Sequence, residues 1–304
     1  VVLWQLSYKF TYVNLLVRVI AIIVVLVIVN KWTNPANKLS WTFLILLSPI
    51  FGLMVYFLFG RSGLTKHTRE RMDAVNRQVE ALFQRDSAEE KGLEKESRSA
   101  YLQSSYIDKW AGFPLYQNTQ TKYYSCGEEM FPDMLEALRG AKHFIFLEYF
   151  IIEEGYMFNT ILDILEEKAK AGVDVRFIYD DVGSINSISF GYYKKLQERG
   201  IPCVTFNPFK PLISVVMNNR DHRKIFVVDG YIGFTGGINL ADEYINKVKR
   251  FGYWKDTGVR IEGEAVWSLT AMFLEMWNYI NRSTEDYSRF LPSLKSRSIK
   301  TPMP

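Results

Sequence analysis

The sequence is poor in the residues that build disulfide frameworks and metal centres. It contains two cysteines, Cys126 and Cys203, which lie far apart and form no C-x-x-C pair. A disulfide framework and a structural zinc site are therefore not expected, and a reducing compartment is the default. Three histidines, His67, His143 and His222, are too few for a polyhistidine metal centre, which leaves acidic side chains as the remaining cation ligands.

A strong charge bias is also missing. The chain has 37 Lys and Arg residues against 33 Asp and Glu residues, a net charge of +4 over 304 residues. This excess is too small to predict nucleic-acid binding, although basic residues gathered in one place would suit an anionic membrane surface. The length allows one or two domains. The sequence opens with Val1, inside an apolar run, so we expect the N-terminus to be incomplete.

Two apolar runs near the N-terminus predict membrane helices. Residues 12–29 are apolar except for a few positions such as Arg18, and residues 41–59 carry no charge. A helix of roughly nineteen residues is about 28 Å long, close to the hydrocarbon thickness of a bilayer. A polar turn with Pro35 separates the runs. We therefore expect a transmembrane helical hairpin over residues 1–60, with Arg18 reaching the interface from a helix end. A pair of buried core helices is the alternative.

Charged residues follow the second run. Four basic residues stand close together there, namely Arg61, Lys66, Arg69 and Arg71. Because Lys and Arg are enriched on the cytoplasmic side of membrane helices, we expect a multi-pass protein of the cell membrane whose soluble part is cytoplasmic. Residues 61–110 have widely spaced apolar residues among many charges, which predicts a juxtamembrane helix and linker. A solvated helix without a specific role fits the same pattern.

Strands and helices alternate in the rest of the chain. The apolar patterns predict strands over residues 143–152, 173–181, 202–206, 224–228, 231–235 and 255–262, and helices over residues 159–171, 190–199 and 265–280. This alternation favours the α/β class, with helices packed on a sheet as a sandwich.

One stretch, residues 220–239, carries residues suited to phosphate chemistry. His222, Lys224 and Asp229 stand as H-x-K-x4-D, and Gly236-Gly237-x-Asn239 follows. Side chains alternate along a strand, so His222 and Lys224 should point the same way and Asp229 to the other face. The imidazole can attack a phosphorus atom or shuttle a proton, and the ammonium can hold anionic oxygens. We expect Asp229 to hold the adjacent loop.

This motif, with its Gly-Gly-x-Asn extension, resembles the signature of the phospholipase D superfamily. Further segments resemble bacterial cardiolipin synthases in the same order along the chain: Asn34-Pro35-x-x-Lys38-Leu39-x-Trp41, Phe146-Leu147-Glu148-Tyr149-Phe150, Asn218-x-Arg220-Asp221-His222-Arg223-Lys224 and Phe251-Gly252-Tyr253-Trp254-Lys255-Asp256-Thr257. The resemblance implies a phospholipase D-like α/β sandwich half over residues 111–304, preceded by the transmembrane hairpin.

The resemblance also implies a phosphatidyltransferase. Such enzymes take a phosphatidyl group from one phosphatidylglycerol, hold it on a histidine and pass it to a second phosphatidylglycerol with release of glycerol, without metal, nucleotide or other cofactor. His222 is then the nucleophile or the general acid and base, and Lys224 and Asn239 donate to the phosphoryl oxygens. Asp256 best matches the family's acidic residue that orients the histidine. Gly237 replaces a serine of many members, so a hydroxyl donor is absent there or replaced by a backbone N–H.

Four other residues and one segment keep two readings each. Arg220 contacts a phosphate or lies on the surface. Glu148, inside an apolar strand, lines the site or forms a buried ion pair, because an unpaired buried carboxylate is costly. Asp180 and Asp181 cap the segment after their strand or line the cleft. Residues 207–217 form a lipid-contacting lip or a solvent loop.

The chain departs from the family in one respect. Cardiolipin synthases of this type carry two H-x-K-x4-D motifs, and this sequence has one. We expect it to be the N-terminal half of a longer enzyme, whose second phospholipase D-like half supplies the other histidine, or else to complete its site as a homodimer. The alternatives are a membrane-bound phospholipase D-type hydrolase and a non-catalytic membrane-anchored half that binds anionic lipid.

Overall fold

A computed structural model of the chain describes residues 2–60, 66–83, 85–208 and 220–291. Most of the predicted lip at residues 207–217 lies outside the described residues. The chain divides into two compact units, an N-terminal helical unit and an α/β unit that begins at Lys66. Each unit is described by itself.

The helical unit consists of α1 (Val2–Asn30), α2 (Pro35–Leu47) and α3 (Pro49–Phe59). Within α1, residues 10–30 have a mean hydropathy of 2.8. Most of their apolar side chains are exposed, for example Leu16, Ile23 and Leu26. Among the described residues, α1 is the one helix long and apolar enough to cross a membrane.

The predicted second span is not confirmed, because residues 41–59 do not form one helix. Ser48 has φ −140° and ψ 86°, and Pro49 starts a new helix. Proline has no N–H to donate and disfavours helical geometry in the residue before it, so the helix breaks there. The backbones of α2 and α3 pack closely, since a Cβ on Gly52 would lie 2.6 Å from Ile45 Cα. Each helix is at most about 20 Å long, shorter than a span.

The α/β unit contains a seven-stranded sheet. Its strands are β1 (Thr119–Tyr124), β2 (Phe144–Tyr149), β3 (Asp174–Asp180), β4 (Cys203–Phe206), β5 (Ile225–Val228), β6 (Ile232–Gly236) and β7 (Gly258–Gly263). Their order is β1-β7-β6-β5-β2-β3-β4. β2, β3 and β4 are parallel, and the other neighbouring pairs are antiparallel. The strand that follows the H-x-K motif, β5, therefore lies in the middle of the sheet.

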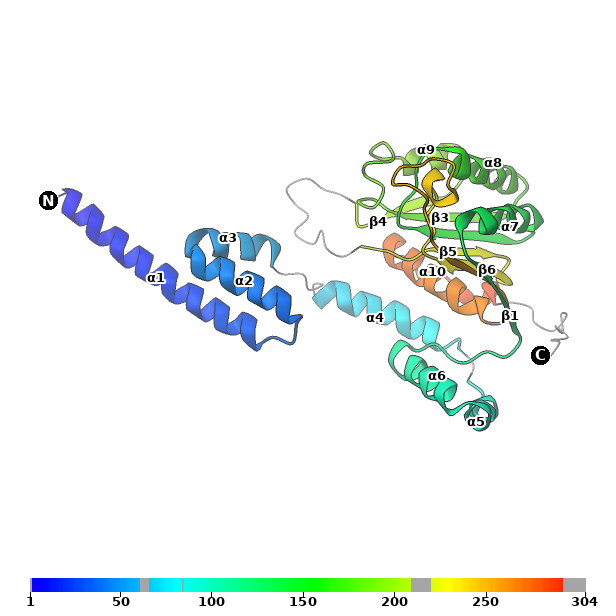
Figure 1. The fold of residues 1–304 in the computed structure, drawn as a ribbon, viewed down its shortest axis with the longest axis horizontal. Coiled ribbons are helices and arrows are strands. Elements are labelled where there is room, and N and C mark those ends of the chain that lie inside the picture. The colour runs from blue at the N-terminus through cyan, green and yellow to red at the C-terminus, as the bar shows by residue number, and fades with distance from the viewer. Residues whose placement is uncertain (1, 61–65, 84, 209–219, 292–304) are drawn as a thin grey trace. The chain divides into compact units, whose positions relative to one another are not determined.

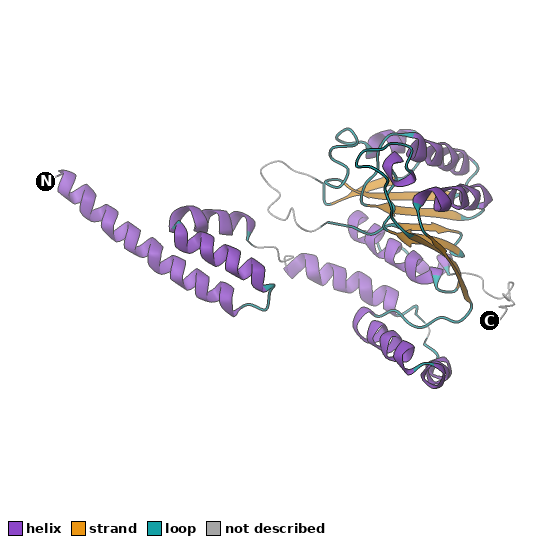
Figure 2. Ribbon diagram, in the orientation of Figure 1, coloured by secondary structure: helices purple, strands orange, loops and turns teal. Residues whose placement is uncertain are grey.

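Helices cover both faces of this sheet (Figure 1). α7 (Gly127–Gly140), α8 (Tyr156–Lys170) and α9 (Tyr193–Glu198) lie on one face, and α10 (Val266–Asn281) lies on the other. Figure 2 shows the resulting layers as helix, sheet and helix. Neighbouring residues of β2 face opposite cores: Leu147 packs in the core under α7 and α8, and Phe146 stacks on Phe273 of α10 at 4.5 Å. The predicted α/β sandwich is confirmed.

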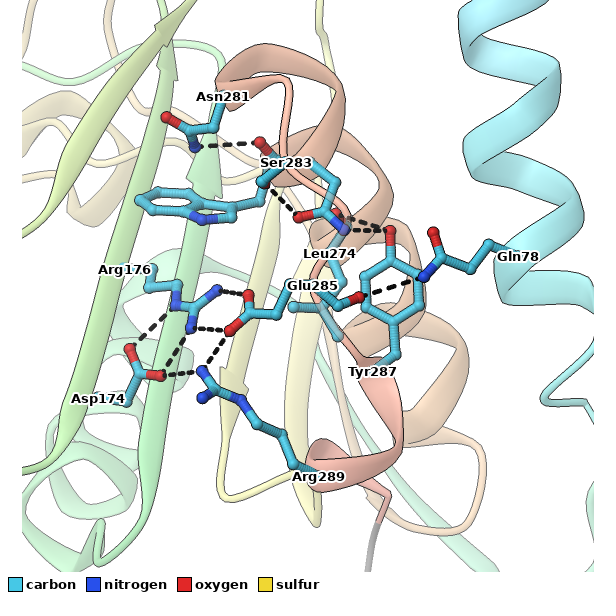
Figure 3. Close-up of polar contacts among 11 residues, drawn as sticks. Gln78, Asp174, Arg176, Leu274, Asn281, Ser283, Glu285, Tyr287 and Arg289 are labelled. Atoms are coloured by element: carbon cyan, nitrogen blue, oxygen red, sulfur yellow. Dashed lines mark hydrogen bonds and ion pairs between the residues drawn. The ribbon is translucent and has the colours of Figure 1, made fainter.

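The segment predicted as a linker packs with the α/β unit. It forms α4 (Lys66–Glu80), α5 (Ser87–Glu96) and α6 (Arg98–Ala111). Val79 of α4 is buried in the core beside α10. Figure 3 shows Gln78 donating to the carbonyl oxygen of Glu285 at 3.3 Å, while Arg176 of β3 binds the Glu285 carboxylate. Arg176 also binds Asp174 at 2.8 Å. Helix α4 is thereby fixed to the sheet and to the segment before the short helix η2 (Tyr287–Phe290).

Candidate active site

His222 and Lys224 lie together at the start of β5, in the centre of the sheet. Lys224 is buried, whereas His222 is exposed. The Lys224 Nζ atom lies 3.3 Å from His222 Nδ1 and donates to the His222 carbonyl oxygen at 2.7 Å. The predicted pairing of the imidazole and the ammonium on one side of the strand is present in the structure.

Burial changes the acidity of this ammonium. Loss of hydration lowers the pKa of Lys224 to about 8, and the nearby carboxylates of Asp221 and Asp256 act in the opposite direction. An ammonium held in a water-poor place is a stronger partner for phosphoryl oxygens than one in bulk water. It also loses its proton at a lower pH, which makes its charge sensitive to pH.

Phe150, directly after β2, packs beside the His222 imidazole. Its ring centroid lies 4.6 Å from that of His222 and 5.3 Å from Lys224 Nζ. Asn239 fixes the backbone next to Phe150. Its buried side chain accepts from the Ile151 N–H at 3.0 Å and donates to the Tyr244 hydroxyl at 2.8 Å. Asn239 thus has a positioning contact that the sequence did not predict, and among the described residues one N–H of its amide makes no hydrogen bond.

Gly237 and Asp256 fit against each other. A Cβ at Gly237 would lie 2.0 Å from Asp256 Oδ1, so the carboxylate occupies the space of the serine found in many superfamily members. The Gly237 N–H donates to the Thr257 carbonyl oxygen at 3.0 Å and is not free for a phosphate. Asp256 itself accepts from the Thr257 N–H at 2.8 Å. Among the described residues the predicted Asp256–His222 hydrogen bond is not formed, and Asp256 acts instead on the charge of Lys224.

Asp229 lies at the far end of β5, away from His222. Its carboxylate accepts from three successive backbone N–H groups, those of Lys142, His143 and Phe144, at 2.7 to 2.9 Å. Its φ of 52° places it in the left-handed region, which Asp tolerates better than most residues. The motif aspartate therefore fastens the start of β2 to the end of β5.

Replacing Asp229 by alanine should lower the stability of the α/β unit by about 2–3 kcal/mol, because three N–H groups lose a charged acceptor and alanine is strained at positive φ. Asp229→Asn keeps an acceptor and tolerates this backbone, so it is the matched control. Thermal unfolding and turnover per folded molecule check the prediction. Loss of turnover in a fully folded Asp229→Asn protein would instead place this residue in the chemistry.

Arg220 and Asp180 organise the peptide that leads into His222. The buried carboxylate of Asp180 accepts from the Asp221 N–H at 2.9 Å and from the Gly183 N–H at 2.8 Å. Arg220 Nη1 lies 3.3 Å from the same carboxylate. Asp180 therefore caps the segment after its strand, which is one of its two predicted readings. Arg220 forms an ion pair with Asp180 instead of extending over the surface.

Glu148 lies on the opposite face of the sheet from His222, in a buried ion pair. Its Oε1 atom is 2.7 Å from Arg223 Nη2, and Arg223 Nε donates to Asp221 at 3.0 Å. Burial raises the pKa of Glu148 well above its usual range, and burial raises that of Glu275 on α10 to about 7. Of the two readings for Glu148 the structure has the ion pair, and the site-lining role is not observed.

Four residues of this arrangement were not predicted: Phe150, Asp221, Arg223 and Tyr244. Arg223 could have been found from strand alternation, since it stands between His222 and Lys224 and must face the other way. Among the described residues, no group of three or more His, Cys, Asp or Glu side chains is arranged to hold a metal ion.

Comparison with known proteins places these features in a family. Residues 134–277 match the family model described as "Cardiolipin synthase, PLD-like domain", and residues 19–61 match "Phospholipase_D-nuclease N-terminal". An uncharacterized protein of Streptococcus mutans is 41% identical over 86% of this chain and 57% of its own length. Cardiolipin synthase 1 of Bacillus cereus is 36% identical over 92% of this chain and 55% of its own length. The chain thus spans about half the length of these relatives.

Among solved structures, the phospholipase D family member Nuc from Salmonella typhimurium matches 56% of this chain and 97% of its own, with 22% identity and a TM-score of 0.39. The sequence matches extend over the H-x-K-x4-D motif, the sheet that carries it and the N-terminal apolar residues. The chain therefore contains a cardiolipin synthase, PLD-like domain over residues 134–277 and a phospholipase D-nuclease N-terminal segment over residues 19–61.

Proposed function

We propose that this chain is the first catalytic half of a cardiolipin synthase. The enzyme would transfer a phosphatidyl group between two phosphatidylglycerol molecules and release glycerol. The observation that carries the proposal is the contact between His222 Nδ1 and the buried Lys224 ammonium at 3.3 Å, a nucleophile beside an anion-binding cation. The similarity to Bacillus cereus cardiolipin synthase 1 over nearly the whole chain supports this choice of reaction.

The chemistry follows from these two side chains. The His222 imidazole attacks the phosphorus of the first phosphatidylglycerol, a P–N bond forms, and the P–O bond to the terminal glycerol breaks. The glycerol oxygen takes a proton from an acid as it leaves. A hydroxyl of the second phosphatidylglycerol then attacks phosphorus and gives its proton back to that group, while the P–N bond breaks. Lys224 holds the phosphoryl oxygens as their charge develops, and the nearby Asp256 carboxylate favours the charged form of Lys224.

The acid in this scheme is a second histidine, supplied by a second phospholipase D-like half. That half would come from the rest of a longer protein or from another copy of this chain. Residues 1–60 would anchor the enzyme in the cell membrane, with residues 111–304 in the cytoplasm. Multi-pass anchoring needs residues 41–59 to cross as well as α1, and the break at Pro49 divides these residues between two helices that are each shorter than a span.

The products test the proposal. The full-length protein, reconstituted in phosphatidylglycerol vesicles, should form cardiolipin and free glycerol in equal amounts. Formation of phosphatidic acid without cardiolipin would contradict the synthase activity and indicate a hydrolase of the same superfamily. Lipid binding without any product would leave a non-catalytic, membrane-anchored half.

The lowered pKa of Lys224 predicts how the reaction rate falls on the alkaline side of its pH profile. Because its pKa is lowered to about 8, kcat/KM for phosphatidylglycerol should fall as pH rises above that value and the ammonium becomes neutral. Lys224→Arg keeps the charge at all these pH values, so its weaker activity should lack this limb. A pH profile between about 6 and 10 checks the prediction. The same limb in both proteins would assign it to another group.

A further inference from the structure

Helix α6 turns its apolar side toward solvent. Leu102, Tyr106, Ile107 and Trp110 are 50–69% exposed. The residues on its inner side are more polar, namely Tyr101, Ser104, Ser105 and Asp108. A surface helix of a globular protein normally has the reverse arrangement. Contiguous exposed apolar side chains mark a surface that another phase or molecule covers.

The exposed charged residues of α6 are all positive. Its single acidic residue, Asp108, is bound by Arg85, whose Nε atom lies 2.9 and 3.1 Å from the two carboxylate oxygens. Arg98 and Lys109 are exposed, and on a helical wheel they flank the apolar side near Leu102. Lys109 Nζ lies 5.4 Å from the centroid of the Trp110 ring. The outer side of α6 is therefore mainly apolar and aromatic, with the polar Ser99 and Gln103 among its exposed residues and cations along one edge.

We propose that this side of α6 lies in the interface of an anionic phospholipid bilayer. Trp and Tyr prefer the interface between hydrocarbon and water, and Lys and Arg beside an apolar side suit anionic headgroups. In the sequence, α6 stands between the membrane-length helix α1 and the sheet. A second protein half would have to reach the site at the start of β5, and Figure 1 shows α6 apart from β5. The bilayer is thus the occupant that fits.

The docked helix would orient the catalytic half. Arg85 also donates to the carbonyl oxygen of Gly112, directly after α6, at 3.3 Å. The rings of Phe83 and Phe113 meet edge to face at 5.4 Å, and α4, which precedes Phe83, is fixed to α10. A bilayer contact at α6 therefore fixes the α/β unit itself and does not depend on phosphatidyl transfer.

Depth measurements test this contact. Spin labels are placed on Leu102→Cys, Tyr106→Cys and Trp110→Cys variants of the chain in phosphatidylglycerol vesicles. Lys91→Cys on the exposed side of α5 is the matched control, and the labelled wild type gives the background of the two buried native cysteines. Labels on α6 should lie about 5–10 Å inside the headgroup boundary, with more oxygen than nickel collisions, and the α5 label should remain aqueous.

Two outcomes would overturn the proposal. Labels on α6 that collide with nickel would show that the helix lies in water. Labels shielded from both oxygen and nickel would indicate that a protein partner covers the helix. The Arg98→Gln/Lys109→Gln variant should lower the ratio of docked to undocked α6 on phosphatidylglycerol vesicles by about fivefold for each cation removed, with little change on phosphatidylcholine vesicles. Equal behaviour on both lipids would refute the anionic preference. None of these readouts needs catalysis.

Discussion

Replacing His222 by alanine should lower phosphatidyl transfer by the full-length protein by a factor on the order of 10⁴ or more, as removal of a covalent nucleophile does in other enzymes. The side chain is exposed and contacts the Phe150 ring and the Lys224 ammonium, so the fold should tolerate the change. Initial rates of cardiolipin formation and thermal unfolding midpoints, measured on the same samples, separate loss of chemistry from loss of structure.

His143→Ala is the matched control for this prediction. His143 is also an exposed histidine of the α/β unit, and the site residues do not include it. Its replacement should leave the rate within about twofold, since surface substitutions usually have small effects. Cardiolipin formation at the wild-type rate by a folded His222→Ala protein would remove His222 from the mechanism and with it the proposed role of Lys224.

Replacing Arg223 by methionine should destabilise the α/β unit by about 3 kcal/mol, the lower end for breaking a buried ion pair, because the Arg223 side chain as a whole is one-third exposed. The change leaves the fully buried Glu148 carboxylate and the Asp221 carboxylate without their cation. For a domain of this size, such a loss lowers the thermal midpoint by roughly 6–12 °C.

The pH dependence of this loss has a definite sign. The folded-state pKa of Glu148 is raised by burial, and removal of Arg223 raises it further. A raised carboxyl pKa means that the folded state holds the proton more tightly, so stability falls as pH rises from the unfolded value through the folded one. The Arg223→Met deficit should therefore be smallest in acid and grow toward alkaline pH.

The Glu148→Gln/Arg223→Met variant tests the cause. It removes both charges and keeps the shape of the buried acid, so it should recover more than half of the lost stability and flatten the pH dependence. A double variant as unstable as Arg223→Met alone would mean that Arg223 acts through packing of its stem rather than through its charge.

The sheet could be predicted from the sequence because its central strands are buried on both faces. The run around Leu147 has no exposed position from Phe144 to Tyr149, and such runs of apolar residues are strong signals. β1 and α7 were not predicted. β1 is a largely exposed edge strand with the polar sequence Thr119–Tyr124, and α7 contains Pro132, a residue that usually ends helices.

The site was predictable in its residue types and less so in its contacts. Strand alternation was enough to pair His222 with Lys224. Which side chain meets Asp256 depends on the rotamer of Asp256, which the sequence does not encode. It also depends on the closeness of Gly237 to Asp256, which only the fold shows. The Glu148–Arg223 pair depends on the antiparallel register of β2 and β5, in which Glu148 lies opposite Ile225. Registers between strands distant in sequence are not visible in periodicity.

If residues 1–60 anchor the protein as proposed, the break between α2 and α3 determines which side of the membrane each end of the anchor occupies. Because α3 packs back on α2 across Ser48, a pair of this shape inserted in a bilayer would enter and leave it on the same side, and it would add nothing to the number of crossings. Whether the number of membrane crossings is odd or even then depends on α1 alone. A single crossing puts the polypeptide before Phe10 and the catalytic half on opposite sides of the membrane, whereas the straight hairpin expected from the sequence would put them on the same side.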